Sequence, residues 1–126
     1  MKAISTPHAP QPGGHYSQAI VHDGLIFVAG QLPIDPRTDE KRVGTIEEQT
    51  EQVFKNISEI LKAAGSDLSL VLKTTVYVSD LELWGRVNTV YARIFGEHRP
   101  ARAIVPVKAL HFGYQIEVEA IAAVKK

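Results

Sequence analysis

The stretch Tyr114-Gln115-Ile116-Glu117-Val118-Glu119-Ala120-Ile121-Ala122-Ala123-Val124 decides how this sequence of 126 residues folds. Its side chains alternate along the chain. One set is apolar, Ile116, Val118, Ala120 and Ala122, and the other is Gln115, Glu117, Glu119 and Ile121. Alternation with a period of two is typical of a strand that buries one face. We therefore expect a sheet with one face toward a core and a second face that carries two carboxylates.

Other segments show similar strand patterns. In residues 70–78 the side chains fall into two alternating sets, Leu72, Thr74, Val76 and Val78 against Val71, Lys73, Thr75 and Tyr77. Residues 101–107 form another strand, in which Arg102 and Ile104 share one face. Residues 17–22 and 25–32 flank Asp23-Gly24, a pair that favours the tight turn of a β-hairpin.

Two segments have the apolar spacing of amphipathic helices. Residues 45–64 open with Thr45 and Glu48, which fit a capping box, and Gly65 follows as a stop signal. The second helix opens at Asp80, a good N-cap, and ends at Gly96. Its apolar residues are Leu83, Trp84, Val87, Val90, Tyr91, Ile94 and Phe95.

The resulting order, ββαβαββ, predicts an α+β fold with a single mixed sheet and two helices on one face. The opposite face carries Lys73, Tyr77, Glu117 and Glu119 beside aliphatic residues, so we expect another subunit to cover it. The length fits one domain, residues 1–126. Residues 1–14 are rich in Pro and Gly and predict an irregular N-terminal arm, and residues 33–44 predict a solvated loop.

Composition excludes several classes of protein. Acidic and basic residues balance at 14 each, so no overall field attracts nucleic acid, and nucleic acid is not an expected partner. The absence of cysteine excludes disulfides and thiolate catalysis and fits a reducing compartment. No stretch approaches the roughly 20 apolar residues that span a bilayer, so the expected location is the cytoplasm. No histidine motif predicts a metal, and no phosphate-binding loop predicts a nucleotide cofactor.

Arg102 lies in an otherwise apolar segment, which is unusual for a charged side chain. A guanidinium in such surroundings needs an anion, either a protein carboxylate or the carboxylate of a ligand. Glu117 and Glu119 also leave two interpretations open. They are either solvated or ion-paired with Lys73 or Arg102, or one of them is a general acid and base whose pKa is raised by apolar neighbours.

The sequence resembles the reactive-intermediate deaminase (Rid) family, whose members have also been described as perchloric-acid-soluble endoribonucleases. The resemblance rests on motifs in the same order along nearly the whole chain: Gly14-His15-Tyr16-Ser17-Gln18-Ala19, Val28-Ala29-Gly30-Gln31-Leu32-Pro33, Lys73-Thr74-Thr75-Val76-Tyr77-Val78, Pro100-Ala101-Arg102 and Ile116-Glu117-Val118-Glu119-Ala120-Ile121-Ala122.

The resemblance implies a chorismate-mutase-like homotrimer with clefts between subunits. It implies hydrolysis of enamines and imines such as 2-aminoacrylate to 2-keto acids and ammonia, without a cofactor. By the same resemblance, Arg102 binds the substrate carboxylate, Glu117 positions water, and Tyr16 and Asn88 lie at the cleft. Glu119 is then structural.

The sequence also departs from the family pattern. Ile104 stands where the best-known members often have cysteine, Ala29 replaces the serine often found before Gly30, and His15 replaces a proline. We expect Ala29, Gly30 and Ile104 to line the cleft, and we expect the departures at Ala29, His15 and Ile104 to shift the range of substrates. The alternative functions are an endoribonuclease or RNA-binding protein, and a non-catalytic binder of small molecules that uses the same clefts.

Overall fold

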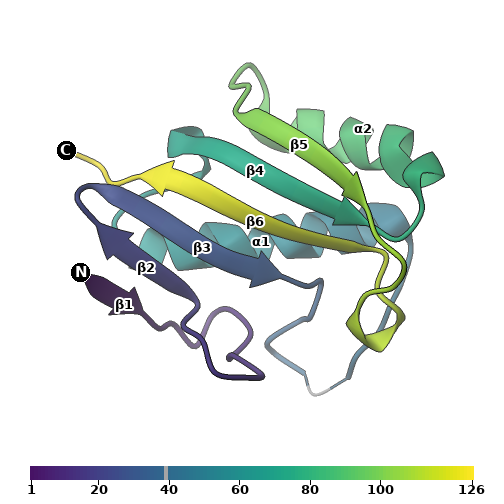
Figure 1. Ribbon diagram of the computed structural model, residues 1–126, viewed down its shortest axis with the longest axis horizontal. Helices are drawn as coiled ribbons and strands as arrows, with labels where there is room; N and C mark the ends of the chain where they lie inside the picture. Colours follow the sequence, from purple (N-terminus) through teal and green to yellow (C-terminus); the bar gives the residue numbers. More distant parts are fainter. Residues whose placement is uncertain (39) are drawn as a thin grey trace.

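The structure, a computed structural model, describes residues 1–38 and 40–126 (Figure 1). Its strands are β1 (Lys2–Ile4), β2 (Ala19–His22), β3 (Leu25–Gln31), β4 (Val71–Val78), β5 (Ala101–Pro106) and β6 (Ile116–Ala123), and its α-helices are α1 (Ile46–Ala63) and α2 (Trp84–Phe95). The described residues also form three short 3₁₀ helices, at Leu68–Leu70, Leu81–Leu83 and His111–Gly113. No helix in the described ranges is long and apolar enough to cross a membrane.

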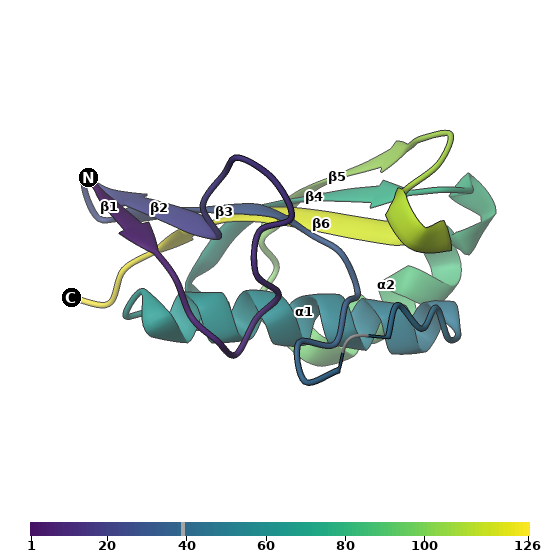
Figure 2. The same cartoon turned by 90° about the horizontal axis from the view of Figure 1, so that it is seen from below.

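All six strands form one sheet in the order β1-β2-β3-β6-β4-β5. The pair β4 and β5 is parallel and the other neighbours are antiparallel, so the sheet is mixed. Both helices pack on the same face of the sheet, and no helix of residues 1–38 and 40–126 lies over the other face (Figure 2). The predicted α+β arrangement is therefore confirmed, with β6 in the middle of the sheet and β5 at one edge.

Local signals account for the elements that the sequence predicted. Asp23 and Gly24 both have positive φ angles, 50° and 78°, as a two-residue hairpin turn of type I′ requires. Thr45 accepts a hydrogen bond from the Glu48 backbone, and the Glu48 side chain accepts one from the Thr45 backbone, which completes the capping box of α1. On β6 the residues with even numbers are buried and those with odd numbers are half-buried, as the alternation predicted.

The arm predicted as irregular for residues 1–14 is partly wrong. Lys2–Ile4 form β1, which pairs with β2 in the antiparallel register Lys2↔Val21. The first proline is Pro7, so nothing in the first residues prevents a ladder of backbone hydrogen bonds. The segment that follows β1 runs from the level of the helices across to the helix-free face before it enters β2 (Figure 2).

Two predictions about which side chains face the core also need correction. The register between β4 and β6 shifts between Val71 and Lys73, so Val71 is buried and Leu72 is 47% exposed, the reverse of the simple alternation. Asp80 caps the 3₁₀ helix Leu81–Leu83 rather than α2 itself. Trp84, expected in the core, is 39% exposed at the start of α2.

The buried side chain of Gln18 holds the N-terminal segment against the sheet. Its Oε1 accepts a hydrogen bond from the Thr6 N–H at 2.8 Å, and its Nε2 donates to the carbonyls of Thr6 at 3.1 Å and Pro10 at 2.9 Å. Because Gln18 is only 1% exposed, removing it leaves buried backbone groups without partners.

We predict that Gln18→Ala lowers the free energy of unfolding by about 1 to 3 kcal/mol, the cost of unsatisfied buried polar groups. Urea unfolding measures this change. Gln11→Ala is the matched control, since Gln11 also donates to the Thr6 carbonyl but is itself exposed; its effect should stay within about 0.5 kcal/mol. Equal effects of the two substitutions would show that Gln18 does not anchor the segment.

Candidate functional site

Arg102 lies on the edge strand β5 and is held by residues of α2. The guanidinium carbon is 4.6 Å from the centroid of the Trp84 ring and 4.6 Å from that of Tyr91. An Arg102 Nη1–H group donates to Asn88 Oδ1 at 2.9 Å. Trp84, Asn88 and Tyr91 follow one another at intervals of four and three residues, which places them on one face of the helix. Two aromatic faces and an amide oxygen therefore fix the orientation of the guanidinium.

No acidic side chain pairs with Arg102 within the residues that the structure describes. Two arginines of α2 do have acidic partners, since Arg86 pairs with Glu47 and Arg93 pairs with Glu51. A guanidinium has five N–H donors in a planar fork, and Asn88 uses one of those of Arg102. The structural ion pair considered from the sequence is therefore not formed within one chain, and Arg102 retains the capacity to bind an anion bidentately.

Glu117 lies on β6, next to a bulge in β3. Between the pairs Val28↔Ala120 and Gln31↔Val118, β3 contains one more residue than β6, so Ala29 and Gly30 form the bulge. A Cβ atom at Gly30 would lie 2.2 Å from Glu117 Oε2. The carboxylate thus lies directly over the backbone of Gly30, in space that only a glycine leaves open.

The two glutamates of β6 differ in their surroundings. Glu119 accepts a hydrogen bond from the Tyr77 hydroxyl at 2.9 Å, whereas the described residues provide no hydrogen bond or ion pair to the Glu117 side chain. Burial raises the pKa of Glu117 above its ordinary value, the His111 imidazole acts in the opposite direction, and the Glu119 carboxylate adds a smaller upward shift. A carboxyl group whose pKa is raised holds its proton more readily than an ordinary glutamate, which suits a group that both donates and accepts a proton.

Tyr16 and Gly30 line a cavity of about 1040 Å³. The cavity lies between the N-terminal segment, the end of β3 and the turn at His111–Gly113. Tyr16 is 54% exposed, and its hydroxyl accepts a hydrogen bond from the Gly13 N–H at 3.3 Å. His15 is also exposed and does not line this cavity.

Strand geometry separates Arg102 from Glu117. Arg102 is the register partner of Thr74, which is buried toward α2 and hydrogen-bonded to Tyr91 at 2.8 Å. Glu117 is the partner of Tyr77 on the same strand, β4. Thr74 and Tyr77 are three residues apart and point to opposite faces of the sheet, and so do their partners.

The sequence-predicted site residues therefore form two groups in one chain. On the helix side are Arg102, Asn88 and Ile104, whose partner on β4 is the buried Val76. On or beside the helix-free face are Glu117, Ala29, Gly30 and Tyr16. The structure brings together the members of each group but does not bring the two groups to one place.

Sequence reasoning missed several neighbours of these residues. Trp84 and Tyr91 were assigned to the helix core, yet they clamp Arg102; their spacing with Asn88 was the available signal. His111, which acts on Glu117, gave no signal because no metal-binding or catalytic motif includes it. The described residues contain no group of three or more His, Cys, Asp or Glu side chains placed to hold a metal ion.

Fold and geometry together define a class: a small one-sheet α+β protein with an arginine poised to bind an anion and a half-buried glutamate on the opposite face. Residues 6–124 match the family model described as endoribonuclease L-PSP. A RutC family protein of Pyrococcus horikoshii is 50% identical over 96% of this chain and 96% of its own. The 2-iminobutanoate/2-iminopropanoate deaminase of Rattus norvegicus is 46% identical over 96% of this chain and 88% of its own.

A solved structure agrees with these matches. TdcF of E. coli, with bound serine, superposes with a TM-score of 0.93 at 33% identity and covers 99% of this chain and 100% of that chain. The chain belongs to the reactive-intermediate deaminase (Rid) family, the family whose model is described as endoribonuclease L-PSP. The resemblance found in the sequence motifs is thus confirmed.

We predict that Gly30→Ala displaces the Glu117 carboxylate while the fold is kept, because the new Cβ would meet the flexible end of a side chain rather than backbone. A crystal structure of the variant measures the displacement, which should exceed about 1 Å to restore van der Waals separation. Gly85→Ala is the control, since a Cβ there meets nothing within 4 Å. An unmoved carboxylate in Gly30→Ala would contradict the assignment of Gly30 as the residue that makes room for Glu117.

Proposed function

We propose that this chain catalyses the hydrolytic deamination of carboxylate-bearing enamines and imines, such as 2-aminoacrylate, to 2-keto acids and ammonia. The observation that carries the proposal is Arg102, clamped by Trp84, Tyr91 and Asn88 and without a carboxylate partner in the described chain. Such a guanidinium suits the carboxylate of a small ligand. Relatives named 2-iminobutanoate/2-iminopropanoate deaminase support the choice of reaction.

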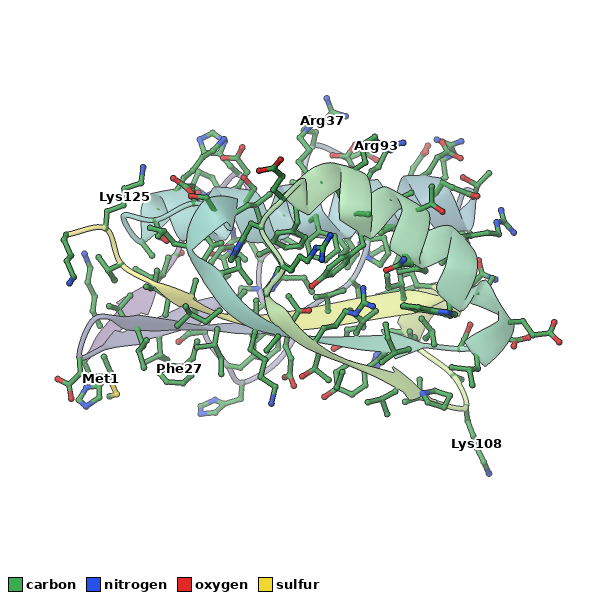
Figure 3. The ribbon with its side chains drawn as sticks, turned by 90° about the horizontal axis from the view of Figure 1, so that it is seen from above. Met1, Phe27, Arg37, Arg93, Lys108 and Lys125 are labelled. Atoms are coloured by element: carbon green, nitrogen blue, oxygen red, sulfur yellow. The ribbon has the colours of Figure 1, made fainter. Side chains whose placement is uncertain are left out.

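The proposed site is shared between copies of the chain in a homotrimer. Since Arg102 and Glu117 point to opposite faces, one substrate contacts both only if one copy supplies Arg102, Asn88 and Ile104 and a neighbour supplies Tyr16, Ala29, Gly30 and Glu117. The helix-free face is suited to such an interface. Phe27 projects from it with 44% exposure (Figure 3), beside a shallow groove lined by Lys73, Thr75 and Ile121.

The proposed reaction begins with the substrate carboxylate on Arg102, which fixes the position of the neighbouring carbon. An enamine takes a proton on its terminal carbon and becomes an iminium ion. Water then adds to the carbon–nitrogen double bond and loses a proton, giving a carbinolamine. Transfer of the hydroxyl proton to the nitrogen and loss of ammonia leave the 2-keto acid. Water supplies the keto oxygen, and no oxidant or cofactor enters the balance.

Glu117 is the proposed group for these proton transfers. Its position over Gly30 and its raised pKa suit a side chain that donates a proton to the enamine and then takes one from water. Asn88 holds Arg102 through its Oδ1 and is a positioning residue in this scheme. Tyr16 closes the cleft, and its hydroxyl forms a hydrogen bond with the substrate.

Ribonuclease activity, which the family description names, is less well supported. The formal net charge is zero, so the chain as a whole gains little from the release of counterions from RNA. The arginines Arg37, Arg42, Arg86 and Arg93 are each paired with an acidic side chain. Proteins that bind single-stranded RNA usually combine a basic groove with a row of aromatic side chains. The charge balance and the paired arginines do not fit this pattern, so we do not propose a ribonuclease function.

We predict that Arg102→Ala and Glu117→Gln impair different steps. Arg102→Ala should lower kcat/KM for an imine generated in place from an amino acid by roughly a hundredfold or more, because the carboxylate loses its anchor. Glu117→Gln should lower kcat by roughly a hundredfold with little change in KM, because only the proton transfer is lost. The measurements are formation of keto acid and release of ammonia.

Two controls accompany these variants. Arg86→Ala removes an exposed arginine of α2 whose ion pair with Glu47 contributes little, and Glu119→Gln keeps a hydrogen-bond acceptor for Tyr77. Both should retain near wild-type rates. Full activity in Arg102→Ala would refute the role of Arg102 in anchoring the substrate, and an unchanged kcat in Glu117→Gln would assign the proton transfers to another group.

A further inference from the structure

The cavity lined by Tyr16 and Gly30 lies beside the Glu117 carboxylate, which sits over Gly30. Its volume of about 1040 Å³ is far larger than 2-aminoacrylate needs, and it lies at the upper end of the range for pockets that hold drug-sized ligands. Most of the exposed lining is apolar. Leu32, Pro36 and Phe112 are among the apolar lining residues, and Phe112 lies in the turn that follows β5.

Phe112 is displayed in this cavity rather than packed in the core. Its side chain is 53% exposed, and its backbone has φ 62° and ψ 18°, the left-handed region that bulky side chains rarely adopt. The ring lies 5.5 Å from the Lys41 ammonium and 6.2 Å from the ring of Tyr114, which meets it edge to face. Residues held in such strained backbone conformations cluster at binding and active sites.

The same turn connects the cavity to the proposed chemistry. His111, the residue before Phe112, has its ring 5.9 Å from the Phe112 ring and also lines the cavity. Its imidazole is close enough to act on the charge of Glu117. Gly30 lies under the Glu117 carboxylate and also lines the cavity, so a substrate whose reacting carbon lies at Glu117 can extend its side chain past Gly30 toward Phe112.

We propose that this cavity, with Phe112 as its selecting residue, receives the side chain of the substrate and favours 2-imino acids with an aromatic side chain over those with a methyl group. The inference rests on the proposed function, because it adds a specificity subsite to the same site. An aromatic substrate gains ring contacts with Phe112 and Tyr16 and fills apolar space that a methyl group leaves empty.

The test compares imines made in place by an amino-acid oxidase from phenylalanine and from alanine, with keto acid formation followed. The wild-type chain should have the higher kcat/KM for the phenylalanine imine. Phe112→Ala should lower the ratio of the two kcat/KM values by about threefold to tenfold, as expected for the loss of one aromatic pair. Phe112→Tyr, which keeps the ring, should restore the ratio. Leu81→Ala, an exposed apolar residue outside the cavity, should leave it unchanged.

The possible results distinguish failure of the proposed subsite from failure of the proposed deaminase function. No preference for the phenylalanine imine, or an equal loss for both imines in Phe112→Ala, would overturn the subsite while the deaminase function stands. If the wild-type chain accelerates neither imine, the proposed function fails, and calorimetric binding of phenylpyruvate and pyruvate decides the subsite. Tighter binding of phenylpyruvate that Phe112→Ala abolishes would support it, and equal binding of the two acids would overturn it.

Discussion

The alternation of side chains across a β-sheet is the constraint on which the rest of this structure depends. It buries Thr74, Val76, Val118 and Ala120 against the helices and leaves the opposite side of the same strands without a covering layer. It also directs Arg102 toward α2 and Glu117 away from it. Each of these two residues is well placed for its proposed role, but the sheet keeps them apart within one chain. This separation is the physical reason for proposing a site between copies.

Each half of the proposed site is preorganised by groups that do not react. The Arg102 guanidinium packs against the Trp84 and Tyr91 rings and donates a hydrogen bond to Asn88, so little side-chain entropy remains to be lost when an anion binds. Glu117 lies over a bulge at Ala29-Gly30, where the missing side chain of glycine provides its space. His111, in the turn at His111–Gly113, acts on this carboxylate and also lines the apolar cavity. We therefore propose that the proton transfers and the selection of the substrate side chain take place side by side.

The sequence predicts those parts of the fold that local interactions determine. The Asp23-Gly24 turn, the Thr45 and Glu48 capping box and the alternation of residues 116–123 all depend on neighbours in the chain, and all are confirmed. Features that depend on distant partners were missed. Pairing of Lys2–Ile4 with β2 leaves no side-chain pattern, and the shift at Val71 and Leu72 is a property of the register with β6. Alternation predicts which residues of one strand share a face, but it does not compare one strand with another. Only the register pairs Thr74↔Arg102 and Tyr77↔Glu117 show that Arg102 and Glu117 point to opposite faces of the sheet.

The most direct test of the shared site is complementation between inactive chains. Arg102→Ala and Glu117→Gln chains are unfolded together in equal amounts, refolded and assayed for deamination of an imine. In a cyclic trimer with each site shared by two neighbours, random mixing restores about one quarter of the sites, so about a quarter of wild-type activity should return. Each variant refolded alone should stay inactive. If the mixture also stays inactive although mixed trimers have formed, Arg102 and Glu117 do not act from different chains, and the account of the site is wrong.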